Sequence, residues 1–222
     1  MKYLMYYFKK ILYLVVFIGF NVSYAGSYED FFSAIKNDDS TTIQQLLARG
    51  FDANTLNPEG AHGLILAIRE PSPKAAMVLI DASKINLNTF NALGESPLML
   101  AALKGQLAMS DKLVKKGADV NKPGWTPLHY AASNGHVEVI KLLLEHHAYI
   151  DAESPNGSTP LMMASMYGNA QSVKLLLDEG ADPLLKNQLG LTALQFAQRG
   201  DRPDSSELLV KAMRSKQLTG AW

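Results

Sequence analysis

Residues 126–136 read TPLHYAASNGH, and this stretch decides the fold. Its opening motif, Thr126-Pro127-Leu128-His129, returns 33 residues later as Thr159-Pro160-Leu161-Met162 and again as Thr192-Ala193-Leu194-Gln195. A fourth copy, Ser96-Pro97-Leu98-Met99, lies 30 residues upstream. Self-similarity at a fixed period of about 20–50 residues indicates a repeat architecture, in which each unit buries its apolar face only against its neighbours.

The residue types of one copy suit the start of a helix. The Thr126 hydroxyl can cap the helix, and Pro127 can take the first helical position, where its missing N–H costs nothing. A second helix is predicted over residues 137–145 from the spacing of its apolar side chains. We expect the inward-facing residues of this unit to be Leu128, Ala131, Ala132, Val137, Ile140, Leu143 and Leu144.

A 33-residue period that carries T-P-L-H-x-A resembles the ankyrin repeat family, over nearly all of residues 28–213. The resemblance implies an all-α solenoid of about six helix-turn-helix repeats with short β-hairpin fingers. It also implies that His129 hydrogen-bonds the capping threonine and the loop of the adjacent repeat. The predicted organisation is a signal peptide (1–25), an N-terminal capping repeat (26–60), a divergent second repeat (61–94), a third repeat with a shortened finger (95–124), a fourth repeat (125–157), a fifth repeat (158–190), a C-terminal capping repeat (191–213) and a polar tail (214–222).

The sequence departs from this pattern at two places, and each departure predicts a local feature of the backbone. The exit of the third repeat, residues 121–125, is three residues shorter than the usual finger, which should leave Trp125 near a notch. His147 stands where Gly117 and Gly180 stand in other repeats. A histidine at that position must accept a left-handed backbone at a cost on the order of 1 kcal/mol.

The first 25 residues have a different character from the repeats. Lys9-Lys10 precede an apolar run over residues 11–20, and small residues follow at Ser23 and Ala25. This order is typical of a cleaved secretory signal, with the cut after Ala25. The alternative is a membrane anchor, but ten apolar residues fall short of the roughly 20 that a spanning helix needs.

Composition limits the remaining function classes. The 222 residues are 47% apolar, which is ample for a core, and the formal net charge is zero, so the general basic field of a nucleic-acid-binding protein is missing. Removing residues 1–25 takes away three of the 21 basic residues and none of the 21 acidic ones, which leaves a net charge of −3. The chain has no cysteine, which excludes disulfides and thiolate chemistry. Export without cysteine suits a bacterial periplasm, and we expect a periplasmic or secreted protein.

Four histidines within 19 residues, namely His129, His136, His146 and His147, raise the question of a metal site. Their places in the repeat argue against one, since no Asp, Glu or Cys set accompanies them at ligand spacing. No serine lies in a nucleophile elbow, and no glycine-rich loop resembles a phosphate cradle. We therefore expect no metal, no cofactor and no enzymatic activity.

The surface that remains is the concave one. Ankyrin arrays generally bind through the finger tips and the exposed ends of the first helices, and aromatic, Met and Arg side chains are enriched at protein interfaces. An alternative is that several of the apolar residues at these positions pack under neighbouring fingers. The candidate partner-binding residues are Leu93, Leu103, Lys104, Trp125, Met166, Tyr167, Leu189, Leu191 and Arg199.

These observations predict a monomeric protein–protein interaction module, or scaffold, that binds a partner protein through its concave ankyrin face in the periplasm. We expect no nucleic-acid partner and no stable membrane insertion after signal cleavage. The alternatives are an inhibitor or immunity-type protein that blocks a toxic or degradative enzyme, and a host-directed secreted effector. Loss of an enzyme's activity on mixing would favour an inhibitor, whereas a complex without inhibition would favour a scaffold.

Overall fold

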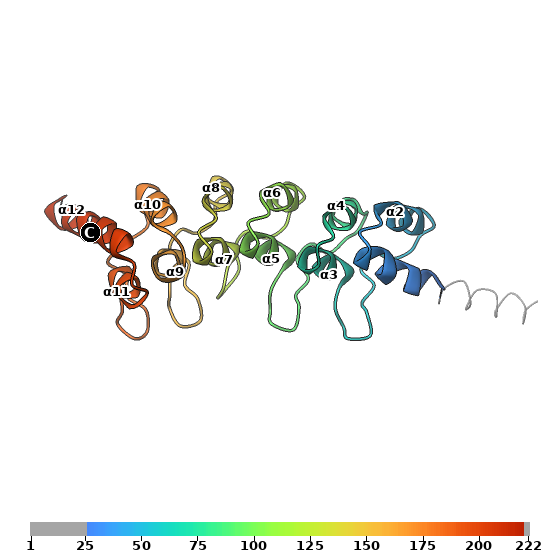
Figure 1. The fold of residues 1–222 in the computed structure, drawn as a ribbon, viewed down its shortest axis with the longest axis horizontal. Helices are drawn as coiled ribbons and strands as arrows, with labels where there is room; N and C mark the ends of the chain where they lie inside the picture. The colour runs from blue at the N-terminus through green and yellow to red at the C-terminus, as the bar shows by residue number, and fades with distance from the viewer. Residues whose placement is uncertain (1–25, 220–222) are drawn as a thin grey trace, which may run out of the picture. The chain divides into compact units, whose positions relative to one another are not determined.

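The structure, a computed structural model, describes residues 26–219 and consists of helices joined by loops (Figure 1). The predicted signal peptide and the last three residues lie outside this range. Within it, no helix is both long and apolar enough to span a bilayer. A helix over residues 26–36 is followed by α2 (Ser40–Ala48), α3 (Gly63–Arg69), α4 (Pro73–Asp81), α5 (Pro97–Leu103), α6 (Leu107–Lys115), α7 (Pro127–Ser133), α8 (Val137–Glu145), α9 (Pro160–Tyr167), α10 (Ala170–Asp178), α11 (Ala193–Arg199) and α12 (Pro203–Thr219).

The repeated motif starts the first helix of a pair, as predicted. Ser96, Thr126 and Thr159 are the N-caps of α5, α7 and α9, and in each case the hydroxyl accepts a hydrogen bond from the backbone N–H three residues later. A proline follows each of them at the start of the helix, where its fixed φ is already helical and its missing N–H would have had no partner within the helix. The helix starts are therefore encoded locally, before any packing between repeats.

The chain divides into two compact units, residues 1–85 and residues 86–222, which we describe separately. In the described part of the first, α3 packs on α4, and α2 packs on α4. In the second, α5, α7, α9 and α11 form one layer, and α6, α8, α10 and α12 form the other (Figure 1). Consecutive helices touch within each layer, so the core is a strip between two rows of helices.

The second helix of the fourth repeat has the predicted bounds but a different buried face. Ile140 and Leu143 are buried as expected, whereas Val137 and Leu144 are only half-buried, and Val139 and Leu142 are buried instead. The reason is that α8 touches α7 and also α6 and α10 on its two flanks. A helix held on three sides buries a wider face than the stripe expected of a helix that packs on one side.

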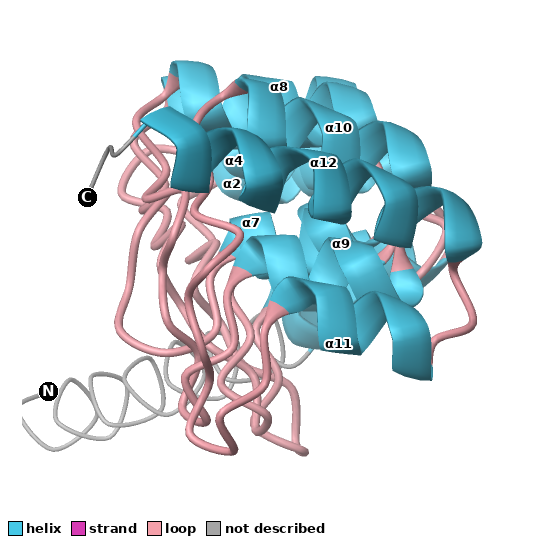
Figure 2. Cartoon of the chain, turned by 90° about the vertical axis from the view of Figure 1, so that its left-hand side faces the viewer, coloured by secondary structure: helices cyan, strands magenta, loops and turns pink. Residues whose placement is uncertain are grey.

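The fingers are tight loops whose tips are closed by backbone hydrogen bonds. In the loop before α5, the N–H of Asn91 donates to the Glu95 carbonyl at 3.1 Å and the N–H of Gly94 donates to the Asn91 carbonyl at 3.0 Å. The same pair of bonds closes the loops that begin at Ser154 and Asn187. Among the described residues, this pairing extends to only one isolated β-bridge, Leu56 with His62. Figure 2 shows these loops projecting together to one side of the helices in the second unit.

The loop before α7 differs from its neighbours and is the shorter one in Figure 1. Instead of a closed tip it carries Lys122, whose ammonium donates to the Gly94 carbonyl at 3.1 Å and lies 5.0 Å from the centre of the Phe90 ring. Gly124 has a φ of +79°, and a Cβ there would lie 3.4 Å from the Pro155 ring. The short loop is thus bonded to the longer loop before α5 and lies close to the loop before α9.

The left-handed backbone expected at His147 is confirmed, with a φ of +65°. The His147 carbonyl accepts a hydrogen bond from the Asn121 amide at 2.8 Å, so the neighbouring repeat holds this conformation through the backbone, while the residue itself is exposed. We expect His147→Gly to raise the free energy of unfolding by about 0.5–1 kcal/mol, because glycine adopts this conformation without a Cβ penalty.

A denaturant melt of His147→Gly measures this effect. The matched control is Gly180→Val at the equivalent position, where φ is +98°. A β-branched residue resists a positive φ, so this variant should lose more stability than His147→Gly gains. A lower stability for His147→Gly than for the unaltered protein would contradict the prediction.

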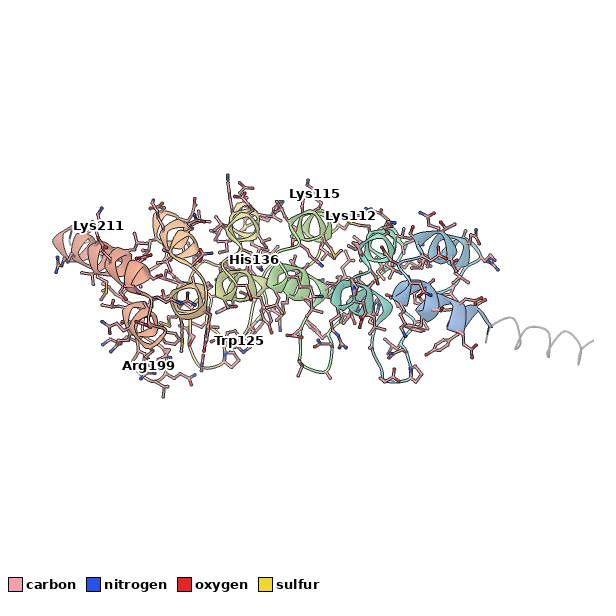
Figure 3. The ribbon with its side chains drawn as sticks, viewed as in Figure 1. Lys112, Lys115, Trp125, His136, Arg199 and Lys211 are labelled. Atoms are coloured by element: carbon pink, nitrogen blue, oxygen red, sulfur yellow. The ribbon has the colours of Figure 1, made fainter. Side chains whose placement is uncertain are left out.

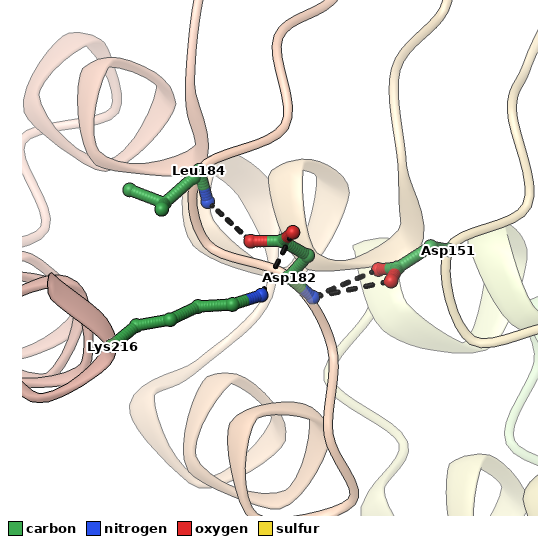
Figure 4. Close-up of polar contacts among 4 residues, drawn as sticks. All are labelled: Asp151, Asp182, Leu184 and Lys216. Carbon is green, nitrogen blue, oxygen red and sulfur yellow. Dashed lines mark hydrogen bonds and ion pairs between the residues drawn. The ribbon is translucent and has the colours of Figure 1, made fainter. Parts of the chain in front are cut away.

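Side chains also join each repeat to the next at the exits of the second helices. The Asn88 and Asn121 side-chain oxygens accept hydrogen bonds from the backbone N–H groups of Asp119 and Tyr149, at 2.8 and 2.9 Å. One repeat later, the Asp151 carboxylate accepts the N–H of Asp182 at 3.1 Å (Figure 4). These bonds fix the spacing of the repeats and hence of the fingers that they carry.

The last helix reaches further than the predicted capping repeat. The segment expected as a polar tail from residue 214 continues α12 up to Thr219. Lys216 on this extension forms an ion pair of 2.8 Å with Asp182 (Figure 4). Burial on its own would raise the pKa of Asp182, but the hydrogen bonds from Lys216 and from the Leu184 N–H, with the Lys216 charge, lower it below its ordinary value. The extension is therefore linked to the body of the second unit.

Candidate protein-binding surface

All nine predicted contact residues lie in the second unit, and the structure places them along two rims. Both rims are built on the first-helix layer, α5, α7, α9 and α11. The loop rim, which precedes the first helices, carries Leu93, Trp125, Leu189 and Leu191. The helix-end rim, where the first helices finish or have just ended, carries Leu103, Lys104, Met166, Tyr167 and Arg199.

The loop rim presents leucines at the tips of long fingers. Leu93 is 82% exposed and Leu189 is 76% exposed, so neither packs under a neighbouring finger. Their positions are fixed by the loops, because the side-chain oxygens of Asn91 and Asn187 accept the N–H groups of Leu93 and Leu189 at 2.9 and 3.0 Å. Leu191 is half-buried. The two finger tips are therefore apolar groups on rigid supports, which lowers the entropy cost of binding.

Trp125 is half-buried beside the short loop, where its ring meets the His129 ring edge to face at 5.3 Å. His129 is itself fixed by three hydrogen-bonding contacts. Its Nδ1 accepts from the N–H and the hydroxyl of Thr126 at 3.2 and 2.9 Å, and its Nε2 donates to the Ser158 carbonyl at 2.9 Å. The predicted bonds of the motif histidine are thus confirmed. They fix the imidazole ring that the Trp125 ring contacts.

These bonds require the neutral form of His129. Nε2 carries the proton that the Ser158 carbonyl accepts, and Nδ1 is the acceptor for Thr126. Burial lowers the pKa of His129 to about 4, although the hydrogen bonds to the Ser158 and Ala152 carbonyls act to raise it. The imidazole therefore stays uncharged at neutral pH and acts as a structural link between repeats.

Where the motif histidine is replaced, sulfur or amide groups take its place. In the third and fifth repeats, the sulfur atoms of Met99 and Met162 accept the N–H of the capping residue at 3.4 Å. In the last repeat, the Gln195 side-chain oxygen accepts the N–H of Thr192 at 2.8 Å. Methionine cannot reach the next repeat with a second hydrogen-bonding group, so the histidine link is specific to the fourth repeat.

The helix-end rim carries Tyr167, which is 55% exposed, beside the half-buried Met166. Carbonyls near this rim accept hydrogen bonds from the following repeat: His136 Nε2 donates to Leu103 at 3.0 Å, and Arg202 Nε donates to Met166 at 3.3 Å. Figure 3 shows Trp125 and Arg199 beside the first-helix layer of the second unit, and Lys112, Lys115 and Lys211 beside the second-helix layer.

The two rims lie at opposite ends of the first helices. Trp125 precedes α7, whereas Met166 and Tyr167 end α9, and a seven-residue helix is about 10 Å long. Leu93, Trp125, Met166 and Tyr167 therefore do not form one compact cluster. A partner that touches all four must cover the inner surface of the first helices between the rims.

Tyr130 lies on that inner surface and was missing from the predicted set. It is half-buried, and its hydroxyl donates to the Glu95 carboxylate at 3.1 Å, while Glu95 also accepts from the Asn91 amide at 2.7 Å. Burial, with the charge of Glu95 and this hydrogen bond, raises the pKa of Tyr130 to about 12. The signal available in the sequence was an aromatic residue directly after the motif histidine, a position that holds Leu100 in the third repeat.

The remaining histidines do not converge. His136 bonds the Leu103 carbonyl, and His147 is exposed at the exit of α8. Within residues 26–219, no group of three or more His, Asp or Glu side chains is arranged to hold a metal ion. The chemistry of the surface is that of apolar contact and hydrogen bonding.

Stacked helix pairs whose loops project to one side define a helical-repeat protein. The chain belongs to the ankyrin repeat family. The family model described as "Ankyrin repeats (3 copies)" matches residues 31–123, 121–187 and 151–219, which together cover most of the chain.

Similar proteins share the repeats with this chain. The crystal structure of an ankyrin repeat domain from Acinetobacter baumannii superposes with a TM-score of 0.73 at 30% identity, covering 82% of this chain and 96% of that one. Ankyrin repeat and SAM domain-containing protein 6 of Rattus norvegicus is 40% identical over 83 residues, 36% of this chain and 9% of that protein. Protein phosphatase 1 regulatory subunit 27 of Mus musculus is 38% identical over 81 residues, 35% of this chain and 53% of that protein. The matches therefore span from about a tenth to about half of these two relatives.

Proposed function

We propose that this protein binds a partner protein through the inner surface of the first-helix layer in residues 86–219, between the loop rim and the helix-end rim. The observation that carries the proposal is the exposure of Leu93, Leu189 and Tyr167 on elements that hydrogen bonds hold in place. Large apolar side chains on a rigid support bind with little ordering cost. Aromatic residues at the centre of such a surface typically supply most of the binding energy.

The inner surface supports binding to another protein better than catalysis. The candidate residues include Trp125, Tyr167, Met166 and Arg199, and these are residue types that protein interfaces favour. The histidine with the largest shift of pKa, His129, is uncharged, buried and bonded on both ring nitrogens, so it has no free position for a substrate. The proposal therefore assigns no reaction to the chain.

The test is affinity capture from the envelope fraction of the native cell, with the Trp125→Ala/Tyr167→Ala variant run in parallel. A partner of this surface should be retained by the unaltered protein and lost from the variant. If the retained protein is an enzyme, its activity should be measured with and without this chain, because inhibition would support the alternative of an inhibitor or immunity-type protein. Equal capture by both baits would mean that the inner surface is not the binding site.

We further propose that the protein is exported and acts in the periplasm. The support is the order of lysines, apolar run and small residues in the first 25 positions, which is typical of a secretory signal. The mature chain should begin at Gly26, the first residue of the first described helix. N-terminal sequencing of the protein from its native cell measures this, and a soluble cytoplasmic protein that retains Met1 would contradict it.

A further inference from the structure

A groove in the first unit has none of the nine predicted contact residues in its lining. It is formed by the helix over residues 26–36, the loop before α3 and α3 itself, and it has a volume of about 460 Å³. The helix over residues 26–36 can approach α3 closely because Gly63 has no side chain, and a Cβ there would lie 2.9 Å from the Phe31 ring. The groove is therefore bordered by two closely packed helices and by the loop over residues 57–60.

The floor of the groove is apolar and fixed before any ligand binds. It consists of Tyr28, Phe32, Ile35 and Leu66. The Tyr28 hydroxyl donates to the Leu56 carbonyl at 3.1 Å, which ties the helix to the loop. The Tyr28 and Phe32 rings meet at 5.0 Å, and Phe32 in turn packs edge to face on the buried Phe31. Tyr28, Phe32 and Leu66 are half-buried, so part of each faces the groove.

The rim of the groove is acidic. Glu29, Glu59 and Glu70 come from the helix, the loop and the end of α3, and all three are exposed. Lys36 is the one cationic residue of the lining. Glu70 is also the C-cap of α3, where the free carbonyls of the helix add partial negative charge. An apolar floor with three carboxylates at its edge is complementary to an apolar group that is flanked by cations.

We propose that this groove binds a segment of a partner protein in which one large apolar side chain is flanked by arginine or lysine. The apolar side chain would lie on Phe32 and Leu66, and the flanking cations would pair with the three carboxylates. Arginine suits the site especially, because its guanidinium pairs with carboxylates and also stacks on an aromatic face such as that of Tyr28. A neutral or acidic segment would cover the carboxylates without supplying partners for them, which is unfavourable.

The experiment is a titration of the purified full-length protein with a fluorescein-labelled pentapeptide that has one phenylalanine between two pairs of arginines. We expect saturable binding that weakens as salt rises, since exposed charge pairs are screened. Two comparison peptides separate the contributions: one has glycine in place of phenylalanine, and the other has glutamates in place of the arginines. Each should bind at least about tenfold more weakly, because each lacks one of the two complementary features.

Glutamine substitutions at the rim of the groove test whether the peptide binds there. Glu29→Gln, Glu59→Gln and Glu70→Gln combined should weaken binding of the arginine peptide at least about tenfold, and the fold should be unaffected because the three side chains are exposed. The matched control combines Glu145→Gln, Glu153→Gln and Glu179→Gln, three exposed glutamates of the second unit that give the same change in net charge. The control should change the affinity less than about twofold, and backbone NMR shifts on peptide addition should concentrate in residues 28–36 and 57–70.

Three outcomes would overturn the proposal. These are no saturable binding of the arginine peptide, an equal loss in the two glutamine triples, or shifts outside the groove. A second copy of this chain is the alternative occupant of the groove, and sedimentation at the same concentrations tests for it. A dimer whose formation displaces the peptide would assign the groove to that second copy. Trp125→Ala/Tyr167→Ala should leave peptide binding unchanged. The groove and the proposed surface of the second unit can therefore fail independently.

Discussion

Replacing Trp125 and Tyr167 together with alanine should weaken partner binding at least about 30-fold while leaving the protein folded. The two residues represent both rims: Trp125 stands at the short loop, and Tyr167 is 55% exposed at the end of α9. A partner that spans the inner surface loses an anchor at each side. About 2 kcal/mol of binding energy, a typical value for a large aromatic anchor, corresponds to this loss of affinity.

Stability must be measured beside affinity, because Trp125 also contacts His129. An aromatic pair of this kind contributes about 0.5–1.5 kcal/mol, so the melting temperature of the double variant should fall modestly. The matched control is Thr159→Ala, which removes the N-cap of α9 and should cost about 1 kcal/mol of stability without changing affinity once folded. A folded double variant with unaltered affinity would move the search to the second-helix layer.

Acidification from pH 7 to pH 4 should remove about 3 kcal/mol of folding stability through His129 alone. Burial lowers the pKa of this residue from 6.5 to about 4 in the folded protein. Between those values the unfolded chain binds a proton that the folded protein does not, so stability falls as the pH falls. Above pH 6.5 both states are neutral and the contribution is fully present. Below pH 4 both are protonated and no further loss occurs.

The chain itself suggests the control for this effect. Met99 and Met162 occupy the histidine position in the third and fifth repeats, so His129→Met should be accommodated. The Ser158 carbonyl would still accept the N–H of Ser154 at 3.0 Å. Urea melts of both proteins at several pH values measure the difference, in which contributions from His62 and the carboxylates cancel. Parallel curves for the two proteins between pH 7 and pH 4 would contradict the prediction.

The fold was predictable because its determinants are local. A threonine followed by proline starts a helix wherever it stands, and a glycine at the exit ends one, so a 33-residue period of such signals gives the helices without knowledge of their packing. The left-handed backbone of His147 followed from the same alignment of repeats. The burial of Val139 and Leu142 could not be predicted in this way, because it depends on contacts of α8 with the flanking helices α6 and α10.

The sequence predicted which residues lie at finger tips and helix ends, but not the distances and contacts between them. Sequence alignment of the repeats placed Leu93 and Leu189 at finger tips and Met166 and Tyr167 at a helix end, where the structure also has them. It did not show that these two sets lie a helix length apart, so that they do not form one compact cluster. Tyr130 was missed because its role depends on Glu95, 35 residues away in the sequence and 3.1 Å away in space. The acidic groove of the first unit combines residues from three elements and has no motif that a sequence can show.

Asp151 of the fourth repeat stands where Asn121 stands in the third, and this difference changes the hydrogen bonds between repeats. Asn121 both accepts a hydrogen bond from the next repeat and donates one to its His147 carbonyl, whereas the ionised Asp151 can only accept. In a one-dimensional array, stability is a sum over neighbouring interfaces, and the weakest interface determines where hydrogen exchange begins. The ion pair of Lys216 with Asp182 adds a connection between α12 and the loop that follows α10. Lys216 therefore holds the last turns of α12 against the preceding repeat, and a chain shortened before Lys216 should exchange the amides of its final repeat faster than the unshortened chain does.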